Sequence, residues 1–149
     1  MSTLKVVSTA GKAELEGVLD ENSDLSGLQG LSGDVSINFK QVLRVNSCGV
    51  REWVNLITKL QSAKISYEEC PIVVVKQLNS VPDFQGKAVV KSFYAPYFCE
   101  SCDEEAVKLL ETSAVSSGSA PELKCEKCGN PMNFDAIPAQ YFSFVKRAA

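Results

Sequence analysis

The chain has 149 residues, of which 45% are hydrophobic, and a formal net charge of -3. This length suits one domain, or one domain with a small appendage, and the composition excludes an intrinsically disordered chain. Histidine is absent, so the chain alone can build neither a Ser-His-Asp triad nor a Cys-His pair, which disfavours an enzyme. The charges form no block of one sign, so electrostatics identifies no partner.

The N-terminal sequence Met-Ser-Thr-Leu-Lys-Val-Val lacks the apolar core of a secretory signal. No window of the chain approaches the ~18 consecutive apolar residues that would span a membrane. We therefore expect a cytoplasmic protein. In that compartment thiols stay reduced, and paired cysteines act as metal ligands or redox groups and not as structural disulfides.

The first elements predict a hairpin followed by a long loop. Leu4–Val7 is a short predicted strand, residues 9–12 form a turn, and Ala13–Leu19 is the returning strand. Asp20–Gly33 is rich in serine, aspartate, asparagine and glycine, so we expect a loop there, with one helical turn at Asp24–Leu28.

A half-buried strand and an amphipathic helix are predicted next. Val35–Phe39 alternates apolar and polar residues, and Val42–Val45 extends this strand past a bulge. The helix is expected to begin at a cap formed by Asn46 or Ser47 and to run to about Ala63. Its apolar stripe consists of Val50, Trp53, Val54, Ile57 and Leu60.

The remaining elements of the first region predict an α/β layer. Ile65–Tyr67 is a strand, and Pro71–Val81 is predicted as a helix with Pro71 at its first position, although its run of valines also suits a strand. Ala88–Tyr94 is the next strand, which gives the order β-β-β-α-β-α-β. Because the apolar stretch Ala88–Phe98 continues into the C-terminal third, we expect the two regions to share a strand.

In the C-terminal region, residues 93–149, three further elements are predicted. Asp103–Glu111 is expected to be a helix, Thr112–Pro121 a loop rich in serine and alanine, and Tyr141–Val145 a closing strand.

Two C-x-x-C pairs, separated by 22 residues, mark this region. Two such turns brought together form a tetrahedral site of four sulfurs, which suits zinc. A metal-free alternative is two redox motifs or four ordinary thiols. Gly129, which follows the second pair, is free to adopt a positive φ, whereas Asp103 occupies the same place after the first. Because every ligand position is a cysteine, a structural site is favoured over a catalytic one. The predicted ligands are Cys99, Cys102, Cys125 and Cys128.

Zinc ribbons often bind nucleic acid, but the charge of this one disfavours that function. Residues 93–149 contain five basic and eight acidic side chains, and a zinc–tetrathiolate cluster adds about two more negative charges. The aromatic residues of this region are therefore expected in the core or at a protein interface. They are Tyr94, Tyr97, Phe98, Phe134, Tyr141, Phe142 and Phe144.

The remaining cysteines lie outside the pairs. Cys70 is expected to be a small buried hydrophobic residue. Cys48 lies at the predicted helix start, where the helix dipole favours a thiolate, so a redox-sensitive thiol protein is an alternative function. The segment Asn46–Gly49 is either a capped helix start or a surface gated by phosphorylation, because helix N–H groups stabilise a phosphoryl group.

Residues 4–92 resemble a STAS domain, the family of anti-sigma-factor antagonists. Gly17-Val18-Leu19-Asp20 is similar to the family's Gly-x-Leu-Asp at the end of its second strand, and Val35–Val45 to its central strand. Asn46-Ser47-Cys48-Gly49 falls on the family's Asp-Ser-Ser-Gly, and Ile65–Pro71 on the next strand. The resemblance implies a STAS-like mixed sheet with packed helices over residues 1–92, extended by a zinc-ribbon-like region over residues 93–149.

The resemblance also implies a function. In the family this loop and the following helix dock onto a serine kinase that is also an anti-sigma factor, and the second serine is the phosphoacceptor. Here Cys48 falls on the acceptor, Ser47 on the first serine, and Asn46 replaces the aspartate. Either Ser47 takes the phosphate or the switch is lost, and we favour its loss. The family's helix between its second and third strands also has no counterpart in the glycine-rich loop.

The predicted function is a non-enzymatic, regulatory protein-binding module with a structural zinc site, and the alternatives are a zinc-ribbon nucleic-acid-binding protein or a thiol protein using Cys48. The residues expected to form the partner-binding or phosphorylation loop are Asn46, Ser47, Cys48, Gly49 and Arg51.

Overall fold

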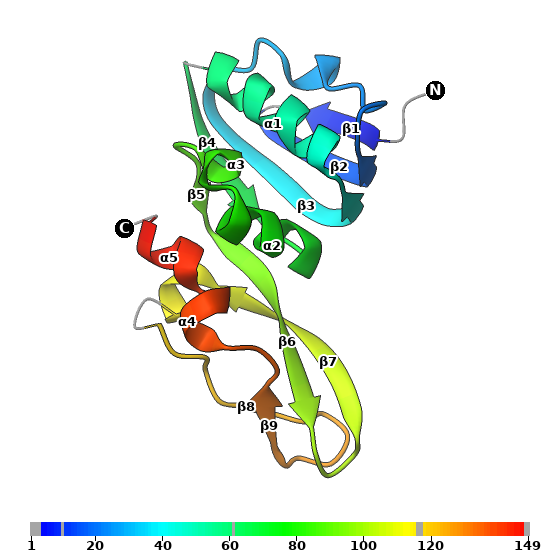
Figure 1. Cartoon of the computed structure of the whole chain (residues 1–149), viewed down its shortest axis with the longest axis vertical. Helices are drawn as coiled ribbons and strands as arrows, with labels where there is room; N and C mark the ends of the chain where they lie inside the picture. Colours follow the sequence, from blue (N-terminus) through cyan, green and yellow to red (C-terminus); the bar gives the residue numbers. More distant parts are fainter. Residues whose placement is uncertain (1–3, 10, 61, 116–117, 148–149) are drawn as a thin grey trace.

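The computed structural model describes residues 4–9, 11–60, 62–115 and 118–147. The chain forms two sheets that follow one another along the long axis of the molecule (Figure 1). The first sheet has five strands and the second has four. Among the described residues, no helix is long and apolar enough to cross a membrane.

The first sheet is mixed. β1 and β2 form the predicted antiparallel hairpin, whereas β2 to β5 run parallel to one another. The register of β2 against β3 shifts twice in the second half of β3, which confirms the bulged strand. Residue 10, in the predicted turn, lies outside the described residues. In spatial order the strands are β1 (Leu4–Thr9), β2 (Lys12–Leu19), β3 (Gly33–Val45), β4 (Ala63–Glu68) and β5 (Val89–Val90).

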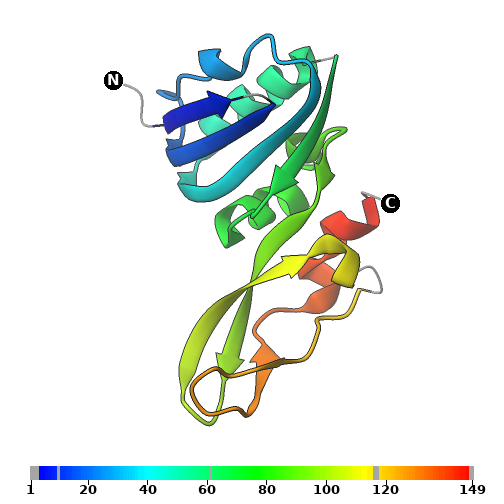
Figure 2. The same cartoon turned by 180° about the vertical axis from the view of Figure 1, so that it is seen from behind.

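Helices pack on one face of this sheet. α1 (Ser47–Lys59) lies in front of β1, β2 and β3 in Figure 1 and behind them in Figure 2, and α2 (Ile72–Ser80) and the short α3 (Pro82–Gln85) follow β4. The loop before β3 carries one 3-10 turn, η1 (Ser26–Leu28), where a single helical turn was expected. The predicted order β-β-β-α-β-α-β is confirmed, with α3 as an addition.

Four aromatic side chains form the centre of the first core. Phe39 from β3 packs edge-on against Trp53 of α1 and Tyr67 of β4, with ring centroids 5.4 and 4.9 Å apart. The Trp53 indole N–H donates to the Tyr67 hydroxyl over 3.0 Å, and that hydroxyl donates to the carbonyl of Phe84 over 2.7 Å. The polar atoms of these buried rings are therefore paired with one another.

The helix boundaries differ from those expected. α1 ends at Lys59 and not near Ala63, because β4 begins at Ala63 and pairs with the start of β3. In the apolar stripe Val54 is only half-buried, and Leu56, which sequence analysis left out, is buried instead. Pro71 is the N-cap of α2 and not its first residue.

The predicted strand Ala88–Tyr94 is confirmed only in part, because it is divided into two strands that belong to different sheets. β5 ends at Val90, and β6 (Ser92–Cys99) opens the second sheet. Lys91 separates them: its N–H donates to the carbonyl of Tyr67 over 2.9 Å, while its carbonyl accepts from the N–H of Thr112 over 2.9 Å. Backbone hydrogen bonds of Lys91 and of Cys70 thus join the two regions, and within the described residues no strand runs through both sheets.

The second sheet is antiparallel, in the order β7, β6, β9 and β8, with β7 at Glu104–Glu111, β8 at Leu123–Lys124 and β9 at Pro131–Phe134. The helix predicted over Asp103–Glu111 is therefore wrong. Its residues favour a helix intrinsically, but eight consecutive pairs with β6 hold them in a strand, from Ser92–Glu111 to Cys99–Glu104.

The predicted closing strand Tyr141–Val145 is also wrong. Two short helices occupy this part of the chain, α4 (Pro138–Tyr141) and α5 (Ser143–Arg147). Pro138 suits the first turn of a helix, and the Asn79 side chain of α2 fixes the junction between the two. Asn79 donates to the carbonyl of Tyr141 over 2.9 Å and accepts from the N–H of Phe144 over 3.0 Å.

The expected loop over Thr112–Pro121 begins with the 3-10 turn η2 (Thr112–Val115). Its residues 116 and 117 lie outside the described residues.

Candidate metal centre

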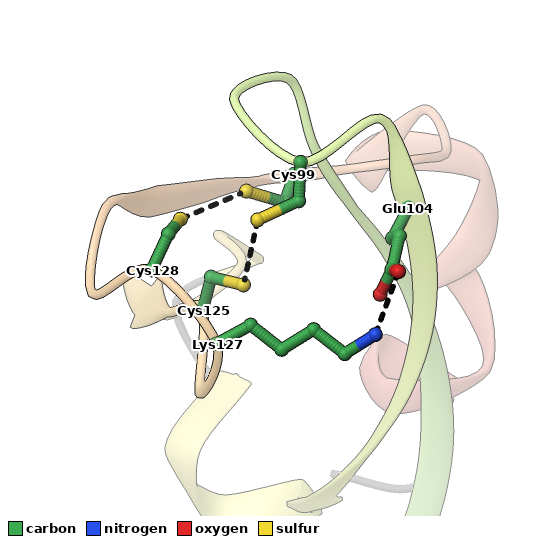
Figure 3. A network of polar contacts seen from close by, with 6 residues as sticks. Cys99, Glu104, Cys125, Lys127 and Cys128 are labelled. Carbon is green, nitrogen blue, oxygen red and sulfur yellow. Dashed lines mark hydrogen bonds and ion pairs between the residues drawn. The ribbon is translucent and has the colours of Figure 1, made fainter.

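Two loops at the far end of the second sheet face one another (Figure 3). Cys99 ends β6 and Cys102 lies in the loop that joins β6 to β7, whereas Cys125 and Cys128 lie in the loop that joins β8 to β9. The four Sγ atoms all lie within 4.8 Å of one another. The structure therefore brings together the four cysteines predicted from the C-x-x-C spacing.

The sulfur separations fit a metal ion. Cys99 and Cys128 are 3.5 Å apart, and Cys102 and Cys125 are 3.9 Å apart. Four sulfurs at ~2.3 Å from a tetrahedral zinc ion stand ~3.8 Å from one another. A disulfide would require ~2.05 Å, and all four thiols are free. The cluster has the composition and spacing to hold an ion such as zinc.

The local backbone explains how each pair turns. Gly129 has a φ of 75°, as expected for the residue after the second pair, and Asp103 adopts a φ of 53° after the first. Asp103 thus takes the left-handed conformation without being glycine, which aspartate tolerates better than most residues. The two loops are also tied together, because the Asn130 amide donates to the Ser101 hydroxyl over 2.9 Å.

Backbone donors and neighbouring thiols shift the pKa values of Cys125 and Cys102 in opposite directions. N–H groups of Cys128 and Lys127 point at the Cys125 sulfur and lower its pKa to about 7. A hydrogen bond with Cys128, together with burial, raises the pKa of Cys102 to about 12. Cys125 is therefore the first of these two thiols to deprotonate, and a bound cation would favour the thiolate at Cys102 as well.

Two ion pairs flank the cluster. The Lys127 ammonium lies 2.6 Å from the Glu104 carboxylate (Figure 3), and Lys108 lies 3.3 Å from Glu126. Each pair joins the β8–β9 loop to β7. Exposed pairs of this kind contribute only ~0–1 kcal/mol each, so they orient the loop and contribute little to its stability. Sequence analysis did not identify these residues, because the cysteine spacing does not show which charges face each other.

The four cysteines differ in their exposure to solvent. Cys99 and Cys125 are buried, Cys102 is half-buried and Cys128 is exposed. Within the described residues the group consists of these four cysteines and includes no carboxylate.

The residues of the predicted partner-binding or phosphorylation loop lie at the start of α1, away from the cysteine cluster. Asn46, Ser47 and Arg51 are exposed, Cys48 is half-buried, and Gly49 is buried. This loop follows β3 of the first sheet and contributes nothing to the cysteine cluster.

Cys70 is fully buried, as expected, and burial raises the pKa of its thiol. It packs where the two regions meet, because its carbonyl accepts from the N–H of Tyr94 over 2.8 Å.

No family model matches the chain, and neither a curated protein nor a solved structure matches it. The fold and the site therefore define its class: a mixed α/β protein extended by an antiparallel sheet whose four-cysteine cluster could hold a metal ion.

Proposed function

We propose that this chain is a non-enzymatic, regulatory protein-binding module: a STAS-like domain with a structural zinc site, resembling an anti-sigma-factor antagonist. The observation that carries the proposal is the junction between β2, β3 and α1. There the two short motifs of the resemblance contact each other, and the start of α1 is left open to a partner.

The contact between the motifs is close. The N–H of Asn46 donates to the carbonyl of Leu19 over 3.1 Å. A Cβ added to Gly49 would lie 2.1 Å from that same carbonyl oxygen, which is far inside any van der Waals contact. Glycine at position 49 therefore lets α1 start directly on the end of β2, and this supports treating the two motifs as one unit.

The same junction makes the loop rigid. The Asn46 side chain caps α1 by accepting from the N–H of Gly49 over 2.8 Å, and its amide donates to Glu21 over 3.0 Å. Ser47 and Arg51 remain exposed beside it. A surface that is held in one conformation loses little entropy on binding, which favours a docking role.

We propose that binding here is constitutive. Cys48 occupies the position of the family's phosphoacceptor, and a thiol is not a substrate for a serine kinase. The neighbouring Ser47 is exposed and is the residue that would carry a phosphate if the switch were retained.

We propose zinc as the metal and a structural role for it. The four cysteines would hold the ion, and the chemistry that it supplies is a cross-link between the β6–β7 and β8–β9 loops. A site in which protein sulfurs fill all four positions leaves none for a substrate, and the chain has no histidine to act as a general base near neutral pH.

The test uses partners captured from the source cell and identified by mass spectrometry. Binding of each purified partner is measured by titration calorimetry for the wild type, Cys48→Asp and Cys48→Ser. We expect Cys48→Asp to weaken binding at least ~10-fold, because it places an uncompensated charge in the interface, and Cys48→Ser to bind like wild type. If Cys48→Asp folds and binds every captured partner as tightly as wild type, the α1 surface is not the docking site.

A further inference from the structure

The free edge of β7 is a second surface that the proposed function does not use. β7 is the outermost strand of its sheet, and within the described residues it pairs with β6 alone. It has eight residues, no proline and no register shift against β6. Natural sheets usually shorten, bulge or cover such an edge, because its unpaired backbone groups recruit another strand.

The outward-facing side chains of β7 are two apolar residues with an acidic residue on each side. Val107 and Leu109 are 56% and 44% exposed. Glu105 and Glu111 share their face of the strand, and both are exposed. The other charged residues of β7 are engaged elsewhere, since Glu104 and Lys108 form the ion pairs beside the cysteine cluster. Two carboxylates therefore flank an apolar pair.

An apolar groove of about 410 Å³ adjoins this pattern. The residues that line it come from both regions: Val107 of β7 and Tyr94 of β6 from the second, and Lys40, Val42, Leu43, Pro71, Ile72 and Val73 from the first. Leu43 is 68% exposed, the highest value among the large apolar side chains of the described residues. An exposed apolar surface that continues across two sheets is typical of a protein-binding site.

Charge argues against a second copy of this chain as the occupant. Two β7 strands that pair antiparallel around Lys108, with their outer faces aligned, place Glu105 directly opposite Glu111 at both ends. That register also places Lys108 opposite Lys108. Like charges in direct opposition destabilise a strand pair, so this register disfavours two copies, whereas a segment with basic residues at both ends meets Glu105 and Glu111 with opposite charge.

We propose that the free edge of β7 docks an extended segment of a partner protein. The segment adds as a strand, places two apolar residues against Val107 and Leu109, and carries a basic residue beyond each of them. Its pattern is basic-x-apolar-x-apolar-x-basic. Strand addition supplies affinity through main-chain hydrogen bonds, and the alternating side chains supply specificity. This proposal is independent of the α1 surface.

Fluorescence anisotropy with two labelled synthetic peptides tests the proposal on the full chain purified without chelator. The peptide GKTVTITKG carries the pattern, and GETVTITEG is its charge-reversed control. We expect the basic peptide to bind about tenfold more tightly, with the difference shrinking at high salt. Hydrogen exchange of the β7 amides is expected to slow when the basic peptide is bound.

Val107→Lys is expected to reduce affinity for the basic peptide at least ~10-fold, since it places a cation between two others. Val89→Lys is the matched control, because Val89 is 52% exposed on β5 of the other sheet, and it should bind like wild type. Cys48→Asp should also leave peptide binding unchanged, which separates this site from the α1 surface.

If Val107→Lys fails to fold, the double variant Glu105→Lys with Glu111→Lys replaces it and should reverse the preference between the two peptides. Absence of binding by the basic peptide, equal binding of both peptides, or equal effects of Val107→Lys and Val89→Lys would each overturn the proposal. Dimerisation of the wild type that Val107→Lys abolishes would overturn it in favour of a second copy.

Discussion

The two sheets of this protein are stabilised in different ways. The first has a conventional core, in which Phe39, Trp53, Tyr67 and Phe84 are all fully buried and in contact. The core of the second sheet differs between its two ends. Near the first sheet the core is aromatic, and at the far end it consists of the cysteine cluster. The cysteine cluster therefore lies at the end of the molecule where few apolar side chains are buried, which is where a bound ion would add most to stability.

The near end of the second sheet depends on the C-terminal helices. Phe93 of β6 packs against Phe142 and Phe144, with ring centroids 5.9 and 5.1 Å apart. At the far end the main buried side chains are Cys99, Cys125 and Met132. We therefore expect mutations in the cysteines, in the first core and at the C-terminal helices to have separable effects.

The largest expected effect is that of Cys125→Ser. Three sulfurs hold zinc far more weakly than four, and binding and local folding form one equilibrium in such sites. Hydrogen exchange should show complete loss of protection in the β6–β7 and β8–β9 loops, while the strands of the first sheet keep theirs. Cys70→Ser, which removes a thiol outside the cluster, is the control for zinc retention. Loss of protection that begins in β2 and β3 would contradict the separation of the two regions.

Trp53→Ala should destabilise the first sheet, whose core contains this side chain. It removes the buried ring that packs against Phe39, Tyr67 and Phe84 and leaves the Tyr67 hydroxyl without its donor, so we expect a loss of about 3–5 kcal/mol in the free energy of unfolding. Chemical denaturation gives this value, and elemental analysis under native conditions should show zinc content equal to that of wild type. A variant that loses its zinc while still folded would show that the two regions are not separable in this way.

A smaller effect is expected from Asn79→Ala. This variant tests the contact between α2 of the first region and the C-terminal helices α4 and α5. The change leaves the N–H of Phe144 and the carbonyl of Tyr141 without their partner, at a cost of about 1–3 kcal/mol. Hydrogen exchange should rise in α4 and α5 first, with zinc content unchanged. Ser80→Ala, next to it on α2 but exposed, should have no such effect. Equal exchange in the two variants would show that Asn79 does not anchor these helices.

Local sequence patterns, which span only a few residues, predict much of the first sheet and the cysteine cluster. The C-x-x-C spacing determines which sulfurs share a turn, and the apolar period of α1 gives its buried face. Boundaries set by distant partners were not predictable. The break at Lys91 depends on the carbonyl of Tyr67 and the N–H of Thr112, and neither can be inferred from the sequence around residue 91.

The wrong elements share one physical cause. In β7 the residues favour a helix, and pairing with β6 overrides that preference. At the C-terminus an aromatic segment favours a strand, but hydrogen bonds from Asn79, more than sixty residues earlier, hold it in two helical turns. The ion pairs beside the cysteine cluster were missed for the same reason, because Lys127 and Glu104 are distant in the sequence and come together only in the folded chain.

The central claim is that four sulfurs hold one zinc ion, and X-ray absorption with elemental analysis on protein purified without chelator tests it most directly. We predict about one zinc per chain, with a first shell of four sulfurs at ~2.3 Å and no nitrogen or oxygen ligand. Cys125→Ser should reduce the zinc content to a small fraction of this value. Much less than one zinc per chain in the wild type, with Cys99, Cys102, Cys125 and Cys128 all titrating as free thiols in the folded protein, would contradict the account.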